Sequence, residues 1–381
     1  MWKVPLFDLN YDHQEQDAVV KVLQSRWLSS GSKTLEFEDA FARYLGGGVQ
    51  CCAMTNCTAA LHTALLLADI KPGDEVVLPG LTFVADLNVV VMMGATPVLA
   101  DAESIQDWNI SPADIKKKIT HRTKALIAVH FAGFPCEMDE LRELCREHEI
   151  TLIEDVAHAV GGSYKGEKCG TLGDIGCFSF FSNKNLSVGE GGMFVCRDKE
   201  LAEKAKLFRS HGMTSMTIDR HQGKSLSYDV RMPGFNYRID EIRSALGLVQ
   251  LRKLDNGNAK RAEIAAHYRS ELKELKKVSI PWQNPQPYSI SSFHIFPILL
   301  EPEVNRQEFM EFLKNRGVQT SIHYPFFGEF TGYSLGEQQG IPICQDISAR
   351  CVTLPLFPTM TKGQTEKVIE SVQEFFSEGK S

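Results

Sequence analysis

Short apolar segments alternate with segments of helical periodicity along the first half of the chain. Residues 124–131 form a continuous apolar run, and residues 138–148 repeat apolar side chains at the spacing of an amphipathic helix. The same alternation continues between residues 51 and 196. Apolar strands separated by helices are typical of a mostly parallel sheet that helices cover on both faces. The pattern therefore predicts an α/β fold.

The expected elements have clear stop signals. Residues 34–45 read as a helix that ends at Gly46-Gly47-Gly48, because glycine is common just past a helix. We interpret that triplet as a cap and turn, not as a phosphate loop. Further helices are expected at 58–68, 138–148 and 200–208, and strands at 75–79, 95–100, 124–131, 151–153, 176–181 and 192–196.

The second half of the chain is organised differently. Residues 213–234 show no period, which is typical of a functional or disordered loop. Residues 239–275 read as one or two long helices, followed by a proline-containing stretch at 281–287. The remainder alternates strand and helix as a small α+β unit. We predict a large domain at residues 1–250 and a small C-terminal domain at residues 251–381.

Composition narrows the class of protein. The 381 residues are 43% hydrophobic and 23% charged, as in ordinary globular proteins, and the net charge of −7 argues against a nucleic-acid surface. None of the ten cysteines forms a C-x-x-C pair, so common zinc and redox spacings are absent and a reducing compartment is expected. The N-terminus does not resemble a signal peptide, and no run is long enough for a membrane span. A cytoplasmic protein without metal is expected.

An acidic pair ends one of the apolar strands. Glu154 and Asp155 follow Leu152-Ile153, at the edge where parallel α/β sheets bind ligands. A carboxylate held there needs a positive partner, which could be an arginine, a metal or a protonated heterocycle. The alternative is that one of the two acids caps the following turn.

One lysine and one turn are also candidates for chemistry. Lys184 follows an apolar strand and lies among small polar residues before Gly189-Glu190-Gly191-Gly192. A desolvated lysine can form a Schiff base, although most lysines are solvated surface groups. The turn at residues 54–58 leads into an apolar helix, whose N-terminus could bind phosphate or could simply be capped by Asn56 or Thr58.

These three features match what pyridoxal 5′-phosphate requires of a protein. The cofactor needs a lysine for an imine, an acid for its pyridine nitrogen and a cradle for its phosphate. The order of cradle, acid and lysine, each after a strand of one α/β domain, favours this interpretation. A nicotinamide enzyme would need G-x-G-x-x-G between strand and helix, which residues 189–192 do not provide.

A set of short motifs follows one order along almost the whole chain: Leu28-Ser29-Ser30-Gly31, Phe37-Glu38, residues 55–62, 81–85, 94–98, 130–133 and 154–161, Phe178-Ser179-Phe180, Lys184 with residues 189–192, Gly234-Phe235-Asn236-Tyr237-Arg238 and His323-Tyr324-Pro325. With these motifs the chain resembles the DegT/StrS family of pyridoxal-phosphate-dependent nucleotide-sugar aminotransferases almost from end to end. The resemblance implies the aspartate-aminotransferase-like fold, called fold type I. It also implies a homodimer with active sites at the interface.

The resemblance assigns roles to individual residues. Lys184 would hold the cofactor and move the proton, and Asp155 would pair with the pyridine nitrogen. His158, where many members have Gln, would lie near the ring hydroxyl, and Phe83 would stack on the ring unless it is a core residue. The phosphate would be held by Thr58, the backbone at Cys57, Ser179 and the partner subunit's Asn236.

Substrate residues follow from the resemblance as well. Ser29, Ser30, His323 and Tyr324 lie in segments that line the sugar pocket of relatives, with a loop or core role as the alternative. Cys57 stands where many members have Gly, which could alter the backbone approach to the phosphate. The 213–234 loop resembles only part of the family, so it is assigned no role.

The implied reaction transfers an amino group from glutamate to a nucleotide-linked keto-sugar. The histidine at position 158 is similar to that of members that aminate 4-keto sugars for surface polysaccharide. One alternative is a sugar dehydratase of the same fold, whose relatives can replace the lysine, whereas Lys184 is present here. The other is a non-catalytic regulator on this scaffold, against which intact Lys184 and Asp155 argue.

Overall fold

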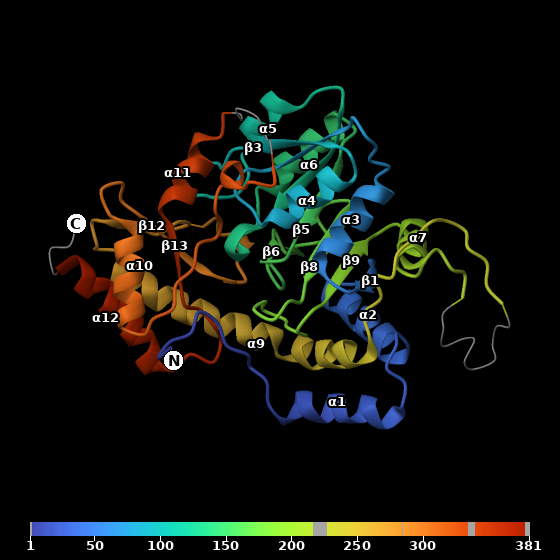
Figure 1. The fold of residues 1–381 in the computed structure, drawn as a ribbon, viewed down its shortest axis with the longest axis horizontal. Helices are drawn as coiled ribbons and strands as arrows, with labels where there is room; N and C mark the ends of the chain where they lie inside the picture. Colours follow the sequence, from blue (N-terminus) through green and yellow to red (C-terminus); the bar gives the residue numbers. More distant parts are fainter. Residues whose placement is uncertain (1, 216–226, 284, 334–339, 378–381) are drawn as a thin grey trace.

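A seven-stranded sheet lies at the centre of the molecule (Figure 1). The computed structural model describes residues 2–215, 227–283, 285–333 and 340–377. The strand order is β1-β9-β8-β5-β4-β2-β3, and β9 is antiparallel to both of its neighbours while the other pairs are parallel. The predicted α/β fold of type I is therefore confirmed. The strands are β1 Gln50–Met54, β2 Glu75–Pro79, β3 Thr96–Ala100, β4 Thr123–Val129, β5 Thr151–Asp155, β8 Ile175–Ser179 and β9 Gly192–Cys196.

Helices cover both faces of this sheet, as its alternating side chains require. Val76 and Leu78 of β2 belong to the apolar core on one face, and Val77 belongs to the core on the other. Strands buried on both faces read as continuous apolar runs, which is why the sequence reveals them. The helices before the C-terminal part are α1 His13–Ser25, α2 Ser32–Tyr44, α3 Cys57–Leu67, α4 Val84–Met92, α5 Pro112–Lys118, α6 Met138–Glu147 and α7 Lys199–Arg209.

The predicted stop after the second helix is confirmed. Helix α2 ends at Tyr44, and Gly46, Gly47 and Gly48 all have φ between 70° and 99°. This left-handed region costs glycine little, because it has no Cβ. Residues 216–226, within the segment expected to be irregular, lie outside the described residues.

A long helix joins the sheet to a second, smaller unit. Helix α9, Glu241–Leu272, runs beneath both in Figure 1 and contacts α1, α2 and α12. The first residues of the chain pack against the smaller unit, where Val4 forms a parallel bridge with Val318. The division at residue 250 remains a prediction. The remaining elements are β6 Ser163–Tyr164, β7 Glu167–Lys168, β10 Val278–Ser279, β11 Ser289–Ile290, β12 Phe296–Leu300, β13 Cys351–Leu354, α10 Arg306–Asn315, α11 Pro342–Arg350, α12 Lys362–Ser377 and the short 3₁₀ turns η1 Phe131–Gly133 and η2 Phe327–Glu329.

The described part of the chain contains no helix with the length and apolar character needed to cross a membrane.

Candidate active site

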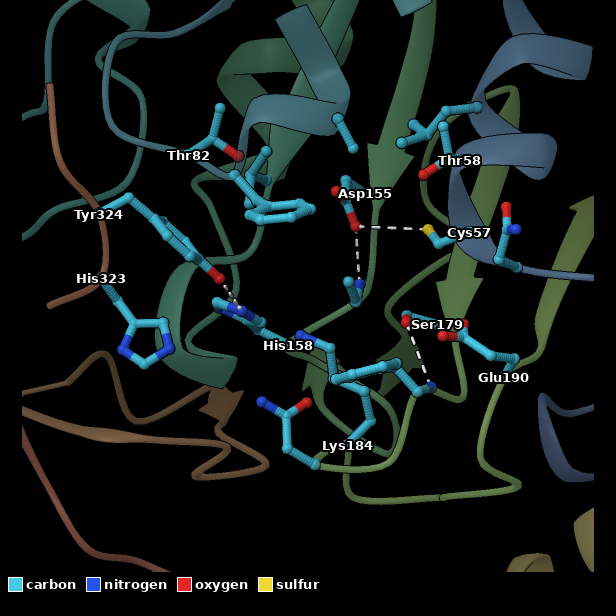
Figure 2. A pocket seen from close by; sticks show the side chains of 18 residues that line it. Cys57, Thr58, Thr82, Asp155, His158, Ser179, Lys184, Glu190, His323 and Tyr324 are labelled. Carbon is cyan, nitrogen blue, oxygen red and sulfur yellow. Dashed lines mark hydrogen bonds between the residues drawn. The ribbon is translucent and has the colours of Figure 1, made fainter. Parts of the chain in front are cut away.

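A cavity of about 410 Å³ opens at the carboxyl ends of the parallel strands. Val129, Asp155 and Ser179, which end β4, β5 and β8, contribute to its wall. Figure 2 shows Cys57 and Thr58 on one side of it and His323 and Tyr324 on the other, with Asp155 and Lys184 between them. The lining residues are Asn56, Cys57, Thr58, Leu61, Thr82, Phe83, Ala85, Val129, Asp155, Ala157, His158, Ser179, Phe181, Asn183, Lys184, Glu190, His323 and Tyr324.

The start of α3 forms an anion-attracting side of the cavity. The Asn56 side chain caps this helix, accepting a hydrogen bond of 2.8 Å from the Ala59 N–H. Other N–H groups of a first helical turn have no partner within the helix, and the helix dipole is positive at this end. The Asn56 cap and a phosphate cradle at Thr58 are thus compatible. Gly192 permits the close approach of β9, because a Cβ there would lie 2.4 Å from the Asn56 carbonyl carbon.

The two acids of β5 point to opposite faces of the sheet and have different hydrogen-bond partners. Glu154 is fully buried away from the cavity and accepts the N–H groups of Gly170, Leu172 and Gly173 at 2.7–2.8 Å. His130 Nε2 donates to the same carboxylate at 2.8 Å, because its Nδ1 accepts the Cys136 N–H. Glu154 therefore holds the loop before β8, and Asp155 faces the cavity.

Asp155 is a buried acid with few neutralising contacts. Its Oδ1 accepts the Ala157 N–H at 2.7 Å and lies 4.0 Å from Cys57 Sγ. Burial raises its pKa, while the hydrogen bond from Ala157 and the charge of Lys184 oppose that rise. Burial and Asp155 together raise the pKa of Asp86 well above its usual value. Two interacting carboxyls in a buried site cannot both ionise cheaply. Because Ala157 and Lys184 favour the ionised form of Asp155, the proton stays on Asp86.

Lys184 lies half-buried on the loop after β8 and points into the cavity (Figure 2). Burial lowers the pKa of its amine to about 8, against the opposing attraction of Asp155 and Cys57. A lysine in this state is partly neutral near physiological pH. It can therefore act both as a nucleophile and as a proton carrier.

His158 is a neutral, fixed imidazole. Its Nδ1 accepts the Ala132 N–H at 3.3 Å, which leaves the proton on Nε2, 2.9 Å from the Tyr324 hydroxyl. Burial, followed by the charge of Lys184, lowers the pKa of His158 well below its usual range. The ring thus presents a defined N–H donor toward Tyr324.

The rest of the predicted site is partly assembled by this chain. Thr58, Phe83, Ser179, His323 and Tyr324 line the same cavity as Lys184. Phe83 is 54% exposed, which excludes a core role, and its ring lies 5.6 Å from that of Tyr324. His323 Nδ1 lies 2.8 Å from Thr353 Oγ1, and burial, helped by Lys184, lowers its pKa to about 4.

Three predicted residues lie outside the cavity wall. Ser29 and Asn236 are exposed, and Ser30 is buried with its hydroxyl donating to the Ile239 carbonyl. Asn236 pairs with Ser210 in an isolated bridge. Their assigned roles, for Ser29 and Ser30 at the sugar and for Asn236 at a partner's phosphate, remain predictions.

Several residues of the site were not expected from the sequence. Thr82, Asn183 and Phe181 line the cavity, and Glu190 belongs to a glycine motif that was noted only for its backbone. His294 Nε2 lies 3.4 Å from Lys184 Nζ although 110 positions separate the two residues. In the sequence, His294 is marked only by its position just before an apolar run. A histidine in such a position is more often a core residue.

Comparison with known proteins identifies the family. The model of the DegT/DnrJ/EryC1/StrS aminotransferase family matches residues 10–373. The chain belongs to this family. It is 34% identical over 372 residues to the spore coat polysaccharide biosynthesis protein SpsC of Bacillus subtilis, covering 95% of this chain and 94% of SpsC.

Solved structures agree with the family model. PseC of Helicobacter pylori, an aminotransferase involved in the biosynthesis of pseudoaminic acid, has a TM-score of 0.90 and 30% identity over 99% of both chains. The PLP-form of Spr1654 of Streptococcus pneumoniae has a TM-score of 0.90 and 25% identity over 99% of this chain and 98% of that chain. The chain is thus a sugar aminotransferase whose cofactor is pyridoxal phosphate, and the lysine, acid and helix N-terminus of the cavity suit that cofactor.

Removing the buried hub at Glu154 should destabilise the protein. Glu154→Ala leaves four buried donors without a partner, so we expect the apparent free energy of unfolding of the apoprotein to fall by about 3 kcal/mol or more. Glu154→Gln should cost less, since one oxygen still accepts. Urea titration followed by far-UV circular dichroism measures both, with exposed Glu167→Gln as the control. An unchanged midpoint for Glu154→Ala would contradict the hub role.

The lowered pKa of Lys184 predicts its reactivity. Only the neutral amine is acylated, so trace labelling of the apoprotein with acetic anhydride should rise with pH around a midpoint near 8 at Lys184. The exposed Lys71, whose pKa is raised by Asp69, serves as the internal control and should be labelled only at higher pH. Peptide mass spectrometry measures both. Identical profiles for the two lysines would show that Lys184 is not desolvated.

Proposed function

We propose that this enzyme transfers an amino group from glutamate to a keto-sugar linked to a nucleotide, in amino-sugar or polysaccharide biosynthesis. The observation that carries the proposal is the placement of Lys184 and Asp155 in one cavity beside the N-terminus of α3. Together these supply an amine of lowered pKa, a buried acid and a phosphate cradle. When bound, the cofactor provides an electron sink for the transfer of the amino group.

Lys184 and Asp155 perform the central tasks in this proposal. Lys184 Nζ takes the proton from the α-carbon of glutamate and returns a proton to the sugar carbon that receives nitrogen. A pKa of about 8 suits both directions, because general acid–base catalysis is most effective near the operating pH. Asp155, ionised beside protonated Asp86, would pair with the pyridine nitrogen and would keep that nitrogen protonated.

The other cavity residues bind and orient. Thr58, Ser179 and the backbone at Cys57 would hold the phosphate, and Phe83 would cover the ring. His158, whose orientation is fixed by the Ala132 N–H, would lie near the ring hydroxyl.

His323 and Tyr324 form the opposite side of the cavity and are proposed to contact the sugar (Figure 2). The names of SpsC and PseC, which refer to polysaccharide and pseudoaminic acid biosynthesis, support a sugar acceptor of this class.

The proposed assembly is a homodimer in the cytoplasm. The exposed aromatic side chains of Phe83 and Phe181 leave apolar surface at the cavity, which a second copy could cover. Ser29 and Asn236 are exposed and could serve a neighbouring subunit. All ten cysteines are buried and unpaired, as expected of a reducing compartment.

Amine transfer tests the proposed reaction directly. The holoenzyme should convert more than one equivalent of glutamate to 2-oxoglutarate only when a suitable nucleotide keto-sugar from a panel is present to accept the amino group. Lys184→Ala should reduce the rate by about 10²-fold or more, and Lys184→Arg similarly, because proton transfer is lost. Lys71→Ala is the matched control and should be unaffected. Release of water without amine would indicate a dehydratase, and protein that stays colourless with added cofactor would indicate a regulator.

A hybrid dimer tests the sharing of active sites. If the partner subunit's Asn236 serves each site, a dimer of one Lys184→Ala and one Asn236→Asp subunit has one doubly defective site and one intact site. Random mixing should then recover about a quarter of wild-type activity, since half of the dimers are hybrids. Each variant alone should be inactive, because an aspartate repels the phosphate. No recovery in tagged, purified hybrids would place Asn236 in its own subunit's site.

A further inference from the structure

His294 contacts the amine of Lys184 from the C-terminal part of the chain. It lies just before β12 and is 3% exposed, and its Nε2 is 3.4 Å from Lys184 Nζ. Its ring also lies 4.4 Å from that of His158, between centroids. No proposed step so far uses this imidazole, although a buried polar ring beside a reactive amine needs a specific reason.

The hydrogen bonds of Asn185 determine which nitrogen of His294 carries the proton. Asn185 Nδ2 donates to Asn258 Oδ1 at 2.7 Å and to the Ser292 carbonyl at 2.8 Å. Its Oδ1 therefore faces His294 Nδ1 at 3.0 Å and must be the acceptor there. With the proton on Nδ1, a neutral His294 presents a lone pair at Nε2. That lone pair points at the Lys184 amine.

The backbone fixes the ring in this position. The His294 N–H donates to the Ala132 carbonyl at 2.9 Å, and the His294 carbonyl accepts from buried Arg261 at 3.1 Å. Arg261 also donates to the Leu356 carbonyl, so it joins the His294 segment to the smaller unit. Because its backbone is held on both sides and its Nδ1 is hydrogen-bonded to Asn185, the His294 ring cannot follow the lysine. It can only offer the lysine one fixed acceptor.

The charges around His294 keep it neutral. Burial lowers its pKa well below the usual value, and the positive charges of Lys184 and Arg261 act in the same direction. Asp155 lies across the cavity and attracts Lys184 instead. A charged imidazole would repel the lysine, whereas a neutral one can accept from both the ammonium and the free amine.

We infer that His294 is a positioning residue that holds the Lys184 amine through Nε2 whenever that lysine is not bonded to the cofactor. The inference rests on the proposed function, in which Lys184 must be free while it carries a proton. A free lysine side chain has several rotatable bonds, and a fixed acceptor removes much of that freedom. The free Lys184 amine therefore stays in one position, from which it can return to the cofactor.

Trace acetylation of Lys184 in the apoprotein tests this inference with two variants. His294→Phe removes the acceptor, so the ammonium loses a stabilising hydrogen bond and the labelling midpoint should fall by about one pH unit. His294→Gln can place an oxygen near the position of Nε2 and should keep the midpoint close to that of the wild type. His267→Gln, which changes a half-exposed histidine, is the matched control. An unchanged midpoint in folded His294→Phe, or an equal fall in His294→Gln, would overturn the inference.

Two further measurements separate this inference from folding effects and from the sugar reaction. ¹⁵N chemical shifts of the wild-type imidazole should show a proton on Nδ1 and none on Nε2, and the opposite tautomer would contradict the inference even if His294→Phe fails to fold. With substrates, His294→Phe should lower kcat about tenfold with little change in KM, and His294→Gln should restore it. Labelling and NMR need no sugar. Failure to aminate any sugar would therefore overturn the proposed function and leave His294 testable.

Discussion

The buried carboxylate of Asp155 is the constraint on which the site depends. An ionised acid at the end of a covered strand is costly unless its surroundings compensate it. Here one backbone N–H at Ala157 and the distant charge of Lys184 offset only part of the cost, and the pKa is raised. Asp86 lowers the remaining cost of ionising Asp155 by keeping its own proton. A cationic ring nitrogen, the partner proposed for Asp155, would compensate this carboxylate further.

The cost of burying charge also determines the state of three histidines, two in the cavity wall and one beside Lys184. His158, His294 and His323 all have lowered pKa values, and in each case burial is the first cause and Lys184 contributes. They are therefore neutral hydrogen-bonding groups, with proton positions that neighbours determine. Among neutral imidazoles the Lys184 amine, with a pKa of about 8, is suited to the proton-carrying role proposed for it. This explains how a site rich in basic side chains avoids competing protonation near neutral pH.

The sequence predicts the part of this site that local pattern controls. Lys184 and Asp155 stand out because a charged residue directly after a buried strand is unusual, and the α3 turn stands out because a polar turn precedes an apolar helix. Asp86 and His294 do not stand out. Asp86 lies in the first turn of α4, where an acid is ordinary, and His294 precedes an apolar strand. Their importance comes from contacts across long sequence separations. The Val4–Val318 bridge is another such contact, and no periodicity encodes it.

The site also requires both parts of the chain to be packed together. Lys184 and Asp155 come from loops and strands of the large sheet, whereas His294, His323 and Tyr324 arrive from beyond α9 (Figures 1 and 2). Arg261 on α9 holds the carbonyls of His294 and Leu356, so one buried guanidinium ties the helix to both segments. If the smaller unit separated from the sheet, Lys184 would lose part of its burial together with its acceptor, and its pKa would return toward that of a solvated lysine. The packing of the two units and the proposed proton transfer therefore depend on the same residues. These residues bury the Lys184 amine and also fix its position.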